Sequence, residues 1–117
     1  MTYYLHIPEA SPSRNVFHHK HWRVEHTAKA RWEKMILVES RVARVPKATG
    51  PRRVLFRRFG KRKLDHDNFI GGLKGPIDCL RKLGLLLDDD EKHASFLFEQ
   101  HTATACEPHT IIGLEDL

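Results

Sequence analysis

Four short runs of aromatic and β-branched residues alternate with more polar segments along the chain. Such runs, bounded by turn-forming residues, are typical of β-strands. The first ends at Pro8, which suits a strand at the edge of a sheet. The pattern therefore predicts strands over residues 2–7 (TYYLHI), 52–60 (RRVLFRRFG), 94–100 (ASFLFEQ) and 109–115 (HTIIGLE).

Two segments between these runs have helical spacing. Residues 22–42 place Ala28, Trp32 and Met35 about one turn apart, with charged residues on the outer face. Residues 76–83 (PIDCLRKL) begin with a proline, which suits a first helical turn, and a glycine follows them. The order β-α-β-α-β-β predicts an α+β fold, a two-layer sandwich with a small mixed β-sheet and helices packed on one face.

The composition is that of one folded domain over residues 1–117, with 40% hydrophobic and 30% charged residues. No apolar run approaches the length of a membrane span, and residues 1–15 lack the basic and apolar regions of a signal peptide. Cys79 and Cys106 are expected to be buried thiols rather than a disulfide framework. We therefore expect an intracellular, cytoplasmic protein without a membrane partner.

The net charge of +5 hides a strong asymmetry along the chain. Residues 1–87 hold 19 of the 20 Lys and Arg residues, whereas residues 88–117 hold eight of the 15 Asp and Glu residues. Residues 51–63 form a basic run without an acid. Clustered cations indicate a nucleic-acid-binding surface. We expect this run to contact DNA phosphates through Arg52, Arg53, Arg57, Arg58, Lys61, Arg62 and Lys63.

Two groups of aspartates follow the basic run. Asp65 and Asp67 come just past the strand over residues 52–60, and side chains at i and i+2 of extended backbone point the same way. Residues 85–91 (LLLDDDE) add a second acidic group after an apolar run. Magnesium is usually bound by one or two carboxylates, with a substrate phosphate completing its ligands. Either group alone is also typical of a solvated loop, but together they predict metal-assisted phosphodiester hydrolysis.

Lys74 follows Asp67 by seven residues, which is about two turns of a continuous helix. Gly71, Gly72 and the Gly75-Pro76 pair predict a kink or a break in that helix, because Pro76 has no N–H to donate. A lysine beside metal-bound carboxylates would steady the attacking water or the scissile phosphate.

The order of these residues resembles the RusA family of Holliday junction resolvases, which is common in phages and prophages. The resemblance rests on Asp65-x-Asp67-Asn68, on Leu73-Lys74, on Asp78 and on LGLLLDDD over residues 83–90. It covers most of the chain and is specific over residues 62–90. It implies a RusA-like endonuclease domain over the whole chain, in a bacterial or phage-encoded protein.

The resemblance implies an enzyme of DNA recombination and repair that cuts four-way junctions as a homodimer. The cofactor would be Mg²⁺, with Mn²⁺ as the alternative, and no organic cofactor is expected. The catalytic residues would be Asp65, Asp67, Asp89 and Lys74, the three acids being the metal ligands. Asp88 and Asp90 stay open as the third ligand, and counting from Gly84 favours Asp89.

Two alternatives to this interpretation stay open. Asp90-Glu91-Lys92 fits half of another nuclease motif, with Asp78 as its upstream acid, on a different fold. The chain could instead be a DNA-binding accessory protein without catalysis, whose acids balance a basic arm. This second alternative predicts that removal of Asp65 or Asp67 leaves function intact.

Overall fold

The computed structural model describes residues 1–14, 22–103 and 107–117. The predicted strands and helices are all present, with bounds that agree within two residues. The break predicted between Asp67 and Lys74 separates α4 from a further short helix, α3, which the sequence pattern did not predict as an element. The elements are, in chain order, β1 (Thr2–Ile7), α2 (Trp22–Val42), β2 (Arg52–Gly60), α3 (His66–Gly72), α4 (Lys74–Lys82), β3 (Ala94–Thr102) and β4 (His109–Asp116).

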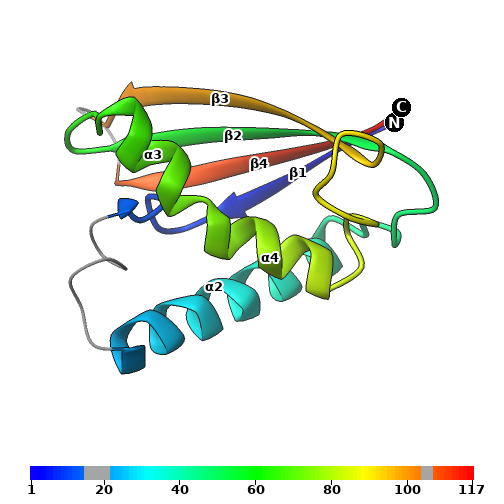
Figure 1. Cartoon of the computed structure of the whole chain (residues 1–117), viewed down its shortest axis with the longest axis horizontal. Helices are drawn as coiled ribbons and strands as arrows, with labels where there is room; N and C mark the ends of the chain where they lie inside the picture. The colour runs from blue at the N-terminus through cyan, green and yellow to red at the C-terminus, as the bar shows by residue number, and fades with distance from the viewer. Residues whose placement is uncertain (15–21, 104–106) are drawn as a thin grey trace.

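The four strands form one mixed sheet in the order β1-β4-β2-β3 (Figure 1). Strand β4 is antiparallel to both β1 and β2, whereas β3 is parallel to β2. A parallel pair needs a crossover connection, and α3 with α4 supplies it. Phe56 shows the register, because it lies opposite Phe98 of β3 and Ile112 of β4.

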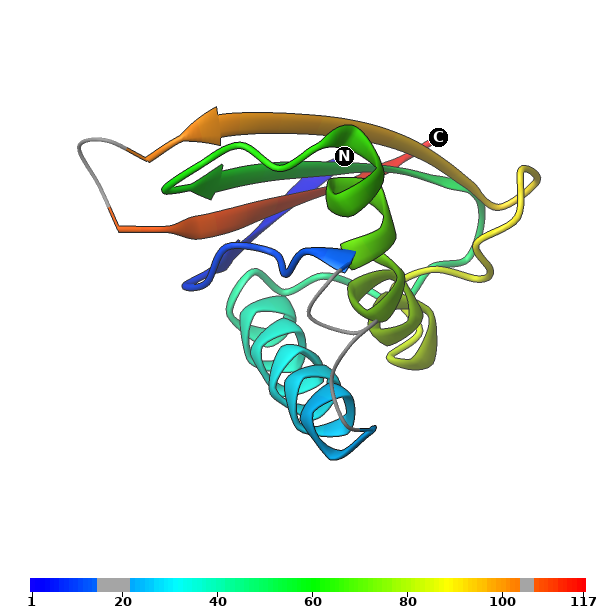
Figure 2. The same cartoon turned by 60° about the vertical axis from the view of Figure 1, so that its left-hand side comes forward.

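The helices cover one face of the sheet, as both views show (Figures 1 and 2). Alternate strand residues point toward them and are fully buried, as alternation along a strand requires. The inward residues are Leu5, Ile7, Val54, Phe56, Ile112 and Leu114, and they pack with Trp32, Ile36, Leu73 and Leu80 of the helical layer. The expected α+β fold with a small mixed sheet and helices on one face is confirmed.

Helices α3 and α4 meet at Leu73, which is fully buried. Its N–H donates to the carbonyl of Ile70 at 3.1 Å, and its own carbonyl accepts from Ile77 at 2.9 Å. Gly72 lies so close to the segment after β1 that an added Cβ would sit 1.7 Å from the carbonyl oxygen of Pro12. A glycine is therefore required where these two segments cross.

The beginning of β2 is held by the buried guanidinium of Arg52. It donates to Asp116 Oδ1 at 2.7 Å, to the carbonyl of Leu85 at 3.0 Å and to that of Pro46 at 2.9 Å. These contacts join the turn before β2, the turn after α4 and the end of β4. None of the helices in the described ranges is both long and apolar enough to cross a membrane.

Candidate metal-binding and DNA-binding residues

Asp65 and Asp67 both lie at the N-terminal end of α3 and are exposed. Asp65 is the residue that precedes the helix, with φ −55° and ψ 148°, and Asp67 belongs to its first turn. The prediction that both lie in extended backbone is therefore wrong for Asp67. The rule that side chains at i and i+2 of extended backbone point the same way therefore does not apply to this pair. Carboxylates at this end of a helix also stabilise it through the helix dipole.

Lys74 is the first residue of α4 and is exposed. The break at Leu73 means that Lys74 and Asp67 do not share one continuous helix. The distance between their side chains therefore depends on the angle between α3 and α4 rather than on a spacing of seven residues.

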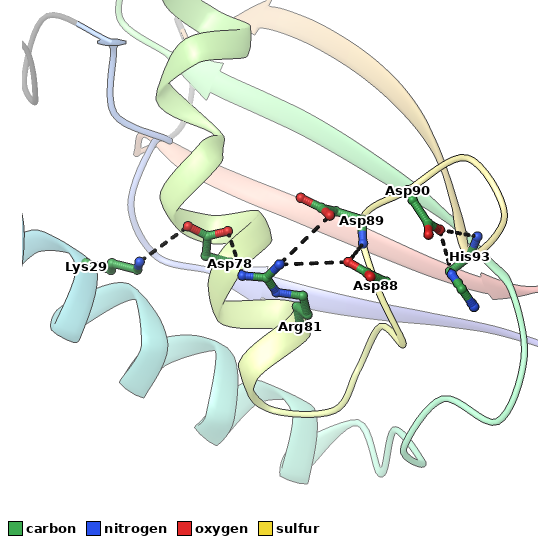
Figure 3. Close-up of polar contacts among 7 residues, drawn as sticks. All are labelled: Lys29, Asp78, Arg81, Asp88, Asp89, Asp90 and His93. Carbon is green, nitrogen blue, oxygen red and sulfur yellow. Dashed lines mark hydrogen bonds and ion pairs between the residues drawn. The ribbon is translucent and has the colours of Figure 1, made fainter.

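The loop from Asp88 to His93, which we call the acidic loop, connects α4 to β3 (Figure 3). Asp88, Asp90 and His93 each offer one ligand atom, and these atoms lie within 4.8 Å of one another. His93 Nδ1 is 2.5 Å from Asp90 Oδ1, and the backbone N–H of His93 donates to the same oxygen at 3.1 Å. In the described part of the chain, this is the group of acids and histidines that could hold a metal ion.

Arg81 of α4 lies between two sets of carboxylates (Figure 3). It is 3.5 Å from Asp78, 3.8 Å from Asp88 and 3.9 Å from Asp89. Asp89, the acid favoured as third ligand, thus lies beside Arg81, whereas Asp88 and Asp90 belong to the group with His93. Sequence reasoning missed both Arg81 and His93, although the Asp-x-x-His spacing of residues 90–93 was available as a signal.

The pKa of Asp88 is lowered. The main cause is the backbone N–H of Asp89, which donates to Asp88 Oδ1 at 2.7 Å, and the charges of Arg81 and His93 act in the same direction. Asp88 therefore stays ionised at neutral pH, which is the state that a hard cation such as Mg²⁺ or Mn²⁺ requires.

The two groups of aspartates lie toward opposite ends of β3. Gln100 hydrogen-bonds with both backbone groups of Leu64, just before Asp65. The carbonyl of Asp90 instead accepts from Ala94, at the beginning of the strand. Ala94 and Gln100 are about 20 Å apart along an extended strand. Asp65 and Asp67 accordingly do not belong to the group that Asp88, Asp90 and His93 form.

The cations of β2 differ in their accessibility. Arg52 is only 1% exposed, so it does not fit the expected contact with DNA. Arg53 pairs with Glu115 at 3.3 Å, and Arg57 pairs with Glu99 at 2.5 Å. The second pair lowers the pKa of Glu99.

Beyond these residues the basic run becomes exposed. Arg58 is half-buried and donates to the carbonyls of Ser11 at 2.8 Å and Arg62 at 3.1 Å, and its burial lowers its pKa. Lys61, Arg62 and Lys63 are exposed, and their side chains make no ion pair within the described residues. These three residues, which we call the basic turn, are the part of the run best placed to contact a phosphate backbone.

The side chains of Phe59 and Cys79 are both engaged in packing. Phe59 is stacked between His101, at a ring-centroid distance of 5.0 Å, and His109, at 4.3 Å. Cys79 is buried, as expected, and its burial is the main cause that raises its pKa to about 11. A thiol with that pKa is a poor nucleophile at neutral pH. Cys106 lies outside the described residues.

The described surface thus combines an acidic loop that could hold a metal ion, a second pair of acids on α3, and exposed cations between β2 and α3. Such a set can bind a divalent cation and a polyanion on one small domain. In the comparisons with known proteins, no protein-family model and no curated protein matches this chain.

Proposed function

We propose that this protein is a Mg²⁺-dependent, structure-specific endodeoxyribonuclease that resolves four-way DNA junctions, with a RusA-like fold. The observation that carries the proposal is the acidic loop, which gathers two carboxylates and an imidazole within 4.8 Å of one another on a chain of net charge +5. Carboxylates that could hold a metal ion, on a protein with a net positive charge, suit the hydrolysis of a phosphodiester.

The donor set of the acidic loop fits a divalent cation. Asp88 and Asp90 supply the carboxylate oxygens that Mg²⁺ and Mn²⁺ prefer, and His93 adds an imidazole nitrogen, a ligand that suits a transition metal better than Mg²⁺. A bound metal would supply an activated water and stabilise negative charge on the phosphate. The exposed cations of the basic turn would hold the DNA strand.

The resemblance implies a different set, in which Asp65, Asp67 and Asp89 hold the metal and Lys74 is the catalytic lysine. Because the two groups of aspartates lie toward opposite ends of β3, Asp65 and Asp67 form the second proposed metal site without Asp89, with Lys74 as its lysine. Both proposals predict that cutting needs a carboxylate, but they name different ones. A homodimer belongs to the same proposal, because a four-way junction has approximate two-fold symmetry and two strands to cut.

The test uses a labelled four-way junction and a matched linear duplex, each with Mg²⁺, Mn²⁺ or EDTA. We expect paired symmetric nicks on the junction only, and only with metal. Asp90→Asn should reduce cleavage by on the order of 100-fold if the acidic loop holds the metal, because the metal that stabilises charge on the reacting phosphate loses a ligand. Asp67→Asn should reduce cleavage by a similar factor if the second proposed metal site holds the metal. Glu91→Gln, in the same loop but outside the group, is the matched control.

One observation favours a second candidate function, that of a DNA-binding accessory protein. Arg81 already balances Asp78, Asp88 and Asp89, as it would if these acids had only a structural role. Tight junction binding without cleavage in either metal would contradict the nuclease and support the accessory protein.

A further inference from the structure

A cavity of about 400 Å³ lies where α2 and α4 end, and four cations but no acid line it. We call it the basic cavity. Apart from these cations and one hydroxyl, the side chains that line it are apolar. The cations are Arg41, Arg44, Lys47 and Lys82, and the hydroxyl is that of Ser40.

Most of this positive charge is not neutralised by the protein. Lys82 pairs with Glu33 at 3.0 Å, but Arg41, Arg44 and Lys47 make no ion pair within the described ranges. Helix dipoles favour cations only near the last turn. Lys47 lies five residues beyond the end of α2, and its side chain packs against Gly84, two residues past the end of α4. A concave surface with one sign of charge concentrates ligands of the opposite sign.

The backbone of Arg44 is strained in a way that places its side chain at this cavity. Its φ is +55°, the one positive φ of a described non-glycine residue. The Val45 N–H donates to the carbonyl of Ser40 at 2.9 Å, which closes α2 in the manner that usually uses a glycine at this position. Strained non-glycine residues cluster at functional sites. Here the strain keeps a guanidinium at the cavity where a glycine would close the helix more easily.

The basic cavity and the basic turn lie at opposite ends of β2. Arg52, at the beginning of the strand, donates to Pro46 and Leu85 beside the cavity, whereas Lys61 follows its last residue. Nine residues of extended strand span about 26 Å. That is the rise of about eight base pairs of duplex DNA. The two basic surfaces are therefore too far apart to hold the same phosphates.

We infer that the basic cavity binds the phosphodiester backbone of a second arm of a branched DNA, while the basic turn contacts the first arm. The inference rests on the proposed function, because it takes branched DNA as the substrate. Guanidinium groups suit this ligand, since they bind phosphate oxygens through two parallel hydrogen bonds.

The test is fluorescence anisotropy in EDTA, with a labelled four-way junction and a linear duplex of one arm. Lys47→Gln and Arg44→Gly should each raise the Kd for the junction roughly fivefold to tenfold and lower its salt slope by about 1, with the Kd for the duplex unchanged. Lys34→Gln, an exposed lysine of α2 outside the cavity, removes the same charge and should change neither.

Arg44→Gly separates binding from folding. It removes the strained φ, so its Tm should rise while its junction affinity falls. If both cavity variants bind the junction as tightly as Lys34→Gln, the inference is wrong and the proposed function stands. Wild-type protein that binds neither DNA would contradict the proposed function, and the inference would fall with it.

Discussion

At the scale of single residues, the alternation of β2 divides a run of similar cations into different roles. Arg52 lies on the inward side of the strand, in line with Val54 and Phe56, while Arg53 points to the open side. The basic run looked uniform in sequence because it contains no acid. The partners of Arg52 are two backbone carbonyls and Asp116, and their positions depend on the whole fold.

Arg52→Ala should therefore destabilise the fold rather than weaken DNA binding. The substitution removes a buried side chain and leaves the carbonyls of Pro46 and Leu85 without a donor, which should cost roughly 2–4 kcal/mol of unfolding free energy. Urea denaturation measures it. Arg53→Ala is the control on the same strand, and the loss of its exposed pair with Glu115 should cost less than about 1 kcal/mol. Equal effects of the two substitutions would contradict the structural role of Arg52.

At the scale of elements, the local pattern predicted the strands and helix α2 well. Each places its apolar residues at a clear helical or strand period, with a proline, glycine or polar segment at its ends. The region over residues 66–82 was harder, because its glycines weaken any helical propensity. The sequence predicted a broken helix there, but the contact of Gly72 with Pro12 brings together residues 60 apart, and no local pattern contains it.

Two glycines of this region should respond to alanine in opposite ways. Gly72→Ala forces a Cβ against the carbonyl of Pro12, and overpacking of this kind costs about 1–3 kcal/mol. At Gly75, in the first turn of α4, an added Cβ would meet no atom within 4 Å apart from its chain neighbours, so Gly75→Ala should stabilise the protein, by no more than about 0.5 kcal/mol because Pro76 restricts the residue before it. Thermal and urea unfolding of both variants measure these two opposite changes in stability. Destabilisation by Gly75→Ala, or tolerance of Gly72→Ala, would mean that α3 and α4 pack differently.

At the scale of the whole molecule, the order of the strands is the part that the sequence could not supply. The parallel pairing of β2 with β3 joins residues about 42 positions apart, such as Arg52 with Ala94, and periodicity carries no information on such pairings. The composition of the candidate metal site could not be predicted from the sequence for the same reason. Single aspartates were visible, but the grouping of Asp88 and Asp90 with His93 depends on how the acidic loop turns into β3.

The sheet also has a face that the helices of the described ranges leave uncovered (Figure 2). Tyr4 and Leu97 are each 50% exposed there and line a shallow hollow of about 320 Å³ together with Arg53 and Glu115. A second copy of the chain related by a two-fold axis would meet this face with its own, so that Arg53 of each copy could pair with Glu115 of the other. The proposed homodimer would then bury the apolar residues that the single chain leaves exposed.

Leu97→Glu should therefore convert the homodimer to monomers without unfolding it, because the introduced charge would be buried against its own copy. Sedimentation velocity measures the mass, and circular dichroism during heating checks that the fold persists. Val38→Glu is the matched control, since Val38 is 48% exposed on α2 and lies outside this face. If both variants stay dimeric, the two copies must associate through another surface. A wild-type monomer would instead remove the dimer from the proposal, because one chain would then have to cut the two strands of a junction in separate encounters.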